Sequence, residues 1–107
     1  MSDQINISGN PIQYDFSVSG EKDVRSKRMI SLQFNNSGPA EVFLNFGEST
    51  KIEFGSADGD SLELYLPDAM LNDILFLLSN WTVTHFTVAY KNSTKEIVNF
   101  NFSSVKK

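Results

Sequence analysis

The chain has 107 residues, of which 40% are hydrophobic and 21% are charged, and its net charge is -4 at pH 7. This length fits one domain, over residues 1–107, and the composition is that of a globular chain rather than a disordered one. The absence of cysteine excludes disulfides, thiolate metal sites and cysteine nucleophiles, and the negative charge argues against binding to a nucleic-acid backbone.

The first ten residues lack the basic start and the apolar core of a secretory signal peptide. No apolar run in the sequence approaches the ~18 residues that would suggest a membrane span. We therefore expect a soluble cytoplasmic protein without a membrane partner. Residues 1–10 also lack a clear period, and we expect them to form a flexible N-terminal segment.

Alternation of apolar and polar residues predicts five strands in the first two thirds of the chain. They cover residues 12–18, 30–34, 42–46, 51–54 and 61–66. We interpret residues 20–28 as a charged connector and residues 35–39 as a turn. Residues 55–60 are expected to form another turn, since Asp58-Gly59 is a favoured turn dipeptide whose glycine tolerates positive φ. Such short connections favour antiparallel neighbours.

One amphipathic helix is predicted over about residues 68–79. Pro67 suits a helix start because its missing N–H is not needed there, and Asp68 adds favourable negative charge to the first turn. Most apolar residues of this segment fall on one side of the helix, which indicates that it covers a sheet. Phe76 lies on the opposite, polar side and is a candidate contact residue.

Two longer strands, at residues 81–90 and 97–102, complete the predicted elements, with a polar turn at 91–94. Residues 104–107, which include two lysines, are expected to be a frayed basic C-terminus. The order of elements predicts an α+β domain in which a mainly antiparallel sheet of about seven strands packs on one helix.

The acidic residues are concentrated in one part of the sequence. Residues 1–40 sum to zero charge, residues 41–73 to -7 and residues 74–107 to +3. In the strands predicted at 51–54 and 61–66, apolar residues alternate with Lys51, Glu53, Ser61, Glu63 and Tyr65. These five side chains are therefore expected on the exposed face of a sheet. The same pattern would also suit a solvated face that only maintains solubility.

Our leading hypothesis is a non-enzymatic protein-binding module. It would be a small acidic inhibitor or antidote, of the immunity type, that occludes a basic partner protein such as a nuclease. Carboxylates would pair with lysine and arginine of the partner, and aromatic residues would add apolar contact area. The predicted contact residues are Glu48, Glu53, Asp58, Asp60, Glu63, Tyr65 and Phe76.

Other kinds of site have little support in the sequence. Asp58 does not begin a calcium loop, because position 5 of that loop would be Leu62. His85 lies within a strand without a recognisable nucleophile motif, and the single glycines form no phosphate-binding pattern. We expect no enzymatic activity, no metal site, no cofactor and no nucleic-acid partner, and the sequence does not indicate a homo-oligomer.

Two alternative functions follow from the apolar residues. The first is a structural subunit of a larger assembly, with Phe76 and the strand at 97–102 as contact surfaces. The second is a small-ligand binder with its site between sheet and helix, near Tyr14, Trp81 and His85.

Overall fold

The computed structural model describes residues 3–21, 24–35, 39–48, 50–80 and 83–105. The described chain contains eight strands, one 3-10 turn and one α-helix. In order, they are β1 (Gln4–Gly9), β2 (Gln13–Glu21), β3 (Val24–Gln33), β4 (Glu41–Gly47), β5 (Glu53–Asp58), β6 (Ser61–Pro67), η1 (Asp68–Met70), α1 (Leu71–Asn80), β7 (Val83–Lys91) and β8 (Ile97–Val105). The prediction of an α+β domain consisting mainly of sheet is confirmed.

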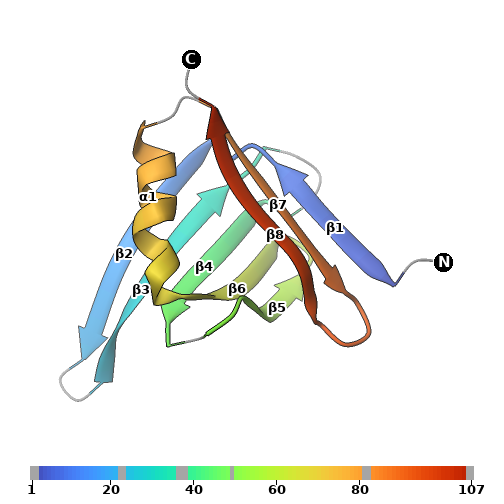
Figure 1. The fold of residues 1–107 in the computed structure, drawn as a ribbon, viewed down its shortest axis with the longest axis horizontal. Coiled ribbons are helices and arrows are strands. Elements are labelled where there is room, and N and C mark those ends of the chain that lie inside the picture. The colour runs from blue at the N-terminus through green and yellow to red at the C-terminus, as the bar shows by residue number, and fades with distance from the viewer. Residues whose placement is uncertain (1–2, 22–23, 36–38, 49, 81–82, 106–107) are drawn as a thin grey trace.

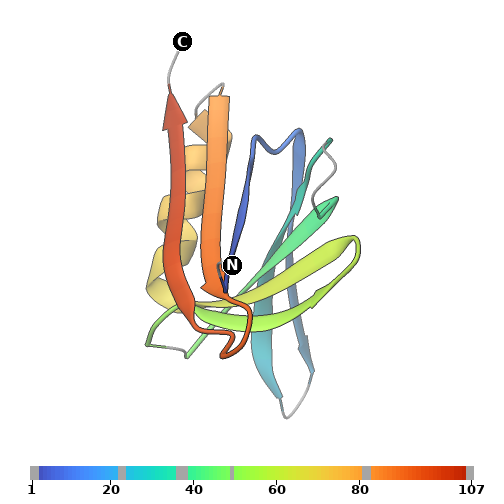
Figure 2. The same ribbon diagram turned by 90° about the vertical axis from the view of Figure 1, so that its right-hand side faces the viewer.

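The strands form two sheets rather than the single sheet that we expected. One has five strands in the order β2-β3-β4-β6-β5, and the other has three in the order β1-β7-β8. The three-stranded sheet and α1 form one layer, which faces the five-stranded sheet across the core (Figures 1 and 2). Each sheet therefore buries only one face, which is why alternation of apolar and polar residues marks most of the strands.

The pairing of β4 differs from the prediction of antiparallel neighbours. β4 pairs in parallel with β6, and β5 lies beyond β6 at the edge of the sheet. The inward side chains of β6 are three leucines that are almost completely buried, whereas the inward side of β5 offers Phe54 and Ala57. The more apolar strand, β6, thus lies in the interior of the sheet with a strand on each side.

The structure places most of the N-terminal segment that we expected to be flexible in a strand. Residues 4–9 form β1, which pairs antiparallel with β7. The backbone oxygen of Asp3 accepts a hydrogen bond of 2.7 Å from the N–H of Asn92, and its carboxylate accepts the N–H of Ser93 at 3.0 Å. Residues 1–2 lie outside the described residues. At the other end, β8 continues to residue 105, and the rest of the predicted frayed terminus, 106–107, also lies outside them.

The predicted charged connector at 20–28 is instead mostly strand. β2 continues to residue 21 and β3 begins at residue 24, in antiparallel register, while residues 22–23 lie outside the described chain. The turn between β5 and β6 occupies only Gly59 and Asp60. Gly59 does not have positive φ, so our reason for that turn is wrong although the turn exists.

The core lies between the two layers. Its fully buried members come from β3, β4, β6 and β7, and the helix adds Leu71 and Ile74. The helix follows the predicted bounds closely, with a 3-10 turn at 68–70 before the α-helix of 71–80. Phe76 is 56% exposed, as its position on the polar side of the helix suggests.

Candidate functional site

The five-stranded sheet has an outer face, turned away from the core, that its register defines. Residues paired across neighbouring strands share a face. Three rows of this face cross all five strands, which are Gln13, Gln33, Glu41, Ser61 and Asp58; Asp15, Ser31, Phe43, Glu63 and Ser56; and Ser17, Met29, Asn45, Tyr65 and Glu53. These three rows contain five carboxylates and no lysine or arginine. Beyond them, the register on β2 and β3 continues with the pair Ser19 and Lys27.

Tyr65 is held in place on this outer face by two neighbours. Its hydroxyl donates a hydrogen bond of 2.9 Å to Oε1 of Glu63. Its ring lies against Gly55, where an added Cβ would come within 2.8 Å of the ring atom Cε2 and within 2.8 Å of the backbone oxygen of Glu63. The ring can therefore take this position because residue 55 has no side chain. It remains 42% exposed.

The acidic surroundings also change the titration of Tyr65. The hydrogen bond to Glu63 is the main cause that raises the pKa of the phenol above its ordinary value of 10.0, with smaller contributions from the charge of Glu63 and from burial. The neutral phenol is favoured because the phenolate would lie beside a carboxylate.

Other carboxylates of the outer face are also fixed by hydrogen bonds. Oε2 of Glu41 accepts a bond of 3.0 Å from the hydroxyl of Ser31 and one of 3.2 Å from the amide of Gln33. Oδ1 of Asp58 accepts the hydroxyl of Ser61 at 3.0 Å. These side chains are oriented before any partner arrives, which lowers the entropy lost on binding.

The structure brings together some of the predicted contact residues and separates others. Glu53, Asp58, Glu63 and Tyr65 share the outer face. Asp60 is exposed in the turn beside Asp58, and Glu48 is exposed in the segment that follows β4.

Phe76 does not share this surface. It lies on α1, in the layer on the other side of the five-stranded sheet (Figure 1). It therefore cannot contact the same small patch of a partner as Tyr65.

The outer-face residues that sequence reasoning missed include Asp15, Glu41 and Phe43. The alternation along β4 contained the signal, since Val42, Leu44 and Phe46 point inward and the residues between them must point outward. That Asp15 lies in the same row as Phe43 depends on strand order, which a local period does not encode.

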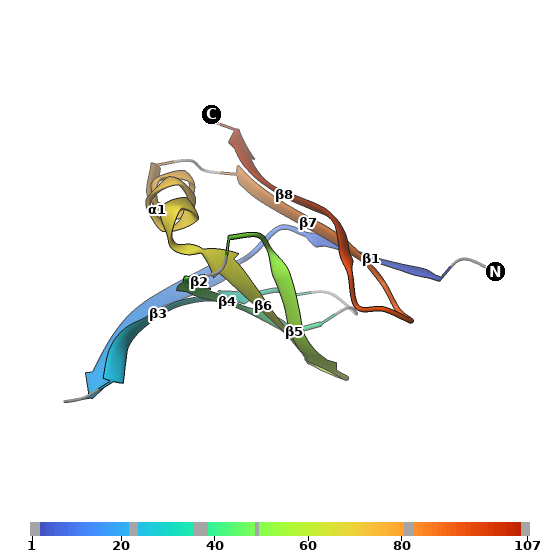
Figure 3. The same ribbon diagram turned by 60° about the horizontal axis from the view of Figure 1, so that its bottom comes forward.

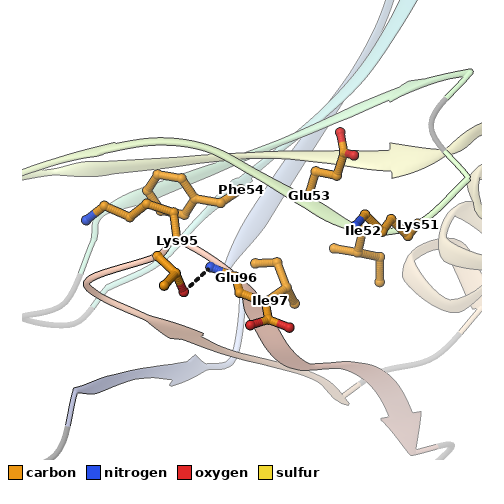
Figure 4. Close-up of a pocket in the computed structure, with 8 residues that line it drawn as sticks. Lys51, Ile52, Glu53, Phe54, Lys95, Glu96 and Ile97 are labelled. Atoms are coloured by element: carbon orange, nitrogen blue, oxygen red, sulfur yellow. Dashed lines mark hydrogen bonds between the residues drawn. The ribbon is translucent and has the colours of Figure 1, made fainter.

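A groove of about 470 Å³ lies where the start of β5 meets the turn between β7 and β8 (Figure 4). It is lined by Lys51, Ile52, Glu53, Phe54, Thr94, Lys95, Glu96 and Ile97. The Nζ atom of Lys95 lies 5.4 Å from the centroid of the Phe54 ring, a cation–π distance. Two lysines and two glutamates balance each other, so charge favours no ligand of either sign.

The ligand site between sheet and helix stays a prediction; among the described residues of the helix, Leu71 and Ile74 are buried in the core. Of the residues named for it, Tyr14 is at the edge strand β2, and Trp81 lies outside the described residues. His85 is exposed, and its Nδ1 lies 2.8 Å from Oδ1 of Asn10. Among the described residues, no three histidine or acidic side chains are grouped so that they could hold a metal ion.

Comparison with known proteins gives no relative: no family model, no curated protein and no solved structure matches the chain. In the part of the chain that the structure describes, no helix is long and apolar enough to cross a membrane. The function must therefore be inferred from the outer face and from the other surfaces of this chain itself.

Proposed function

We propose that this chain is a non-enzymatic protein-binding module, a small cytoplasmic inhibitor of the immunity type that occludes a basic partner such as a nuclease. The observation that carries the proposal is the outer face of the five-stranded sheet, where five carboxylates occur and no lysine or arginine accompanies them in the three rows. Because like charges are gathered there, the face attracts a basic surface.

The residues at the centre of this face supply apolar contact area. Its middle strands carry Phe43, Met29 and Tyr65, and carboxylates occupy other positions of the three rows. An aromatic centre within a polar rim is typical of protein interfaces. Tyrosine suits this position because its rigid ring loses little conformational entropy on binding.

The hydrogen bonds of the outer face favour binding over mere solubility. A face that only keeps a protein soluble needs charges, but it does not need them oriented. Here Glu41 and Glu63 each accept hydrogen bonds from side chains of the same face, and the fixed carboxylates can receive the paired N–H groups of an arginine. In an inhibitor of a nuclease, they would occupy the positions of substrate phosphates.

Charge reversal on the outer face tests the proposal. The variant Glu53→Lys with Glu63→Lys changes the net charge by the same amount as Asp73→Lys with Glu96→Lys, whose residues lie on the helix and in the β7–β8 turn. Each tagged protein is used to capture partners from extracts of its native cell. We expect wild type and the second variant to retain the same basic protein and the first variant to lose it.

Binding of the captured protein, once purified, is then measured by stopped-flow and calorimetry. We expect the first variant to associate at least tenfold more slowly at low salt, and its rate to depend less on ionic strength. Equal binding by both variants and the wild type would show that the outer face is only a solvated surface, and the proposal would be wrong.

A further inference from the structure

The edge strand β2 carries an apolar row that the rest of the chain leaves largely uncovered. Tyr14 and Phe16 are paired with Leu32 and Ile30 of β3, so their row lies on the core side of the sheet. In the described chain β2 has no other neighbouring strand, and it forms the outer margin of the molecule (Figures 1 and 3). The exposed fractions are 68% for Ile12, 36% for Tyr14, 42% for Phe16 and 58% for Val18.

Edge strands of monomeric proteins are usually protected against pairing with other chains. Lysine on the apolar face, a proline within the strand or a bulge serves this purpose. The register of β2 with β3 shifts between Ser19 and Glu21, beyond the apolar row. The row itself contains no charged residue, and the one carboxylate between residues 13 and 19, Asp15, lies on the outer face. The open edge therefore combines an exposed apolar row with backbone groups that no other strand pairs.

We infer that β2 pairs with β2 of a second copy of this chain, antiparallel and centred on Phe16. A twofold axis perpendicular to the sheet keeps the apolar rows of both copies on one side. Phe16 then lies opposite the partner's Phe16, and Tyr14 opposite the partner's Val18. Aromatic pairs and pairs of an aromatic with a β-branched residue are among the favourable cross-strand neighbours.

The same register also satisfies the outer face. Asp15 lies opposite the partner's Ser17, so the two Asp15 carboxylates are diagonal neighbours and no like charges are directly opposite each other. A shift of the centre to residue 15 would place the two Asp15 carboxylates opposite each other, which is destabilising. A shift to residue 17 would place Tyr14 opposite the partner's Gly20 and lose the central aromatic pair. The charges and the apolar residues therefore favour the register centred on Phe16.

The area of the row indicates how stable this dimer is. With about 150–250 Å² for a whole aromatic side chain, the exposed parts of the four side chains come to roughly 400 Å² per copy, which is the most that they can bury, against about 800 Å² per partner in a standard interface. We therefore expect a dimer that dissociates on dilution. In this dimer, the outer faces of the two copies lie on the same side of one continuous sheet. The inference itself does not depend on what the outer face binds.

Sedimentation velocity over a range of concentrations tests the inference. We expect the wild type to change from monomer to dimer between about 5 and 500 µM. Val18→Lys, at a site already 58% exposed, should fold normally and raise the concentration of half-dimerisation at least tenfold. The matched variant Ser17→Lys adds the same charge on the outer face, opposite the partner's Asp15, and should dimerise as well as wild type or better.

Cysteine cross-linking tests the register, because the chain has no cysteine of its own. Residues directly opposite in neighbouring strands have Cα atoms about 4.5–5.5 Å apart, within the range for a disulfide. Phe16→Cys alone should give a disulfide-linked dimer on mild oxidation. Tyr14→Cys or Val18→Cys alone should not, but a mixture of the two should. The inference is overturned if the wild type stays monomeric throughout, which would leave the row to a different protein. It is also overturned if Val18→Lys leaves the dimer intact. Cross-linking of Tyr14→Cys to itself would refute the register.

Discussion

At the scale of single residues, the outer face depends on how Tyr65 is placed. Its ring lies over Gly55 on β5, and its hydroxyl binds a carboxylate two residues earlier on its own strand. Glycine is unfavourable within a strand because it has no side chain to pack, but a neighbouring aromatic ring compensates by covering it. The bulge at residues 54–56 of β5 is thus part of the site, since it sets the backbone that the ring covers.

The titration of Tyr65 reports this arrangement. Because Glu63 raises the pKa of the folded phenol above 10.0, the unfolded chain loses this proton at lower pH than the folded protein does. The linked stability is therefore complete below the ordinary pKa and is lost as pH rises through the folded pKa. We expect the Cζ resonance of Tyr65 in ¹³C-labelled protein to titrate with a midpoint above 10.0, and Glu63→Gln to lower that midpoint.

The control for this titration is Glu41→Gln, which removes a carboxylate of the outer face that is not among the causes of the shift. It should leave the midpoint of Tyr65 nearly unchanged. If both variants lower the midpoint equally, the general negative potential of the face sets the titration, and the hydrogen bond to Glu63 does not.

At the scale of elements, the sequence was informative where a property is local. Alternation assigned inward and outward positions in most strands, so Glu53, Glu63 and Tyr65 were correctly expected to face away from the core. The pairing of strands was not accessible in this way. It depends on which strand buries the most apolar area. The interior position of β6 beside β4 becomes clear only when the inner faces of all the strands are compared.

The N-terminal strand shows another limit of sequence patterns. β1 is short, and its one apolar pair, Ile5 and Ile7, is surrounded by polar residues. Its conformation depends on contacts with distant residues. It pairs with β7 along its length, and Asp3 accepts a hydrogen bond from the β7–β8 turn. Contacts between residues some 90 positions apart do not produce a periodic pattern in the local sequence, which is why this segment was expected to be flexible.

Removal of the Asp3 carboxylate tests that explanation. In Asp3→Ala, the N–H and hydroxyl of Ser93 lose their acceptor, and β1 should open more often. We expect the amides of β1 to exchange with deuterium about tenfold faster, equivalent to about 1.4 kcal/mol, while those of β3 and β4 change little.

Asp15→Ala serves as the control for the loss of an exposed carboxylate and should leave exchange in β1 at the wild-type rate. If Asp3→Ala accelerates exchange equally in every strand, the contact stabilises the whole fold and does not specifically order β1.

At the scale of the whole molecule, aromatic contacts join the two layers: the ring of Phe54 on β5 lies 4.8 Å from that of Tyr90 on β7, and a larger cluster surrounds Phe86. Phe86 of β7 is fully buried. Its ring centroid lies 6.0 Å from that of Phe34, which follows β3, and 5.6 Å and 6.2 Å from those of Phe100 and Phe102 on β8. It thus contacts both sheets at once. The positions of the outer face and of the edge strand relative to the rest of the protein depend on this contact.

A comparison of two phenylalanines tests this role. Phe86→Ala leaves a cavity between the layers, and we expect a loss of about 3–5 kcal/mol in the free energy of unfolding. Phe76→Ala removes a side chain that is 56% exposed and should change it by no more than about 0.5 kcal/mol. Urea denaturation measures both.

Since the total stability of such a domain is only about 5–15 kcal/mol, Phe86→Leu provides a milder variant that should still fold. If Phe86→Leu is no less stable than Phe76→Ala, the layers are held together by other parts of the core, and the aromatic cluster is not the main link between them.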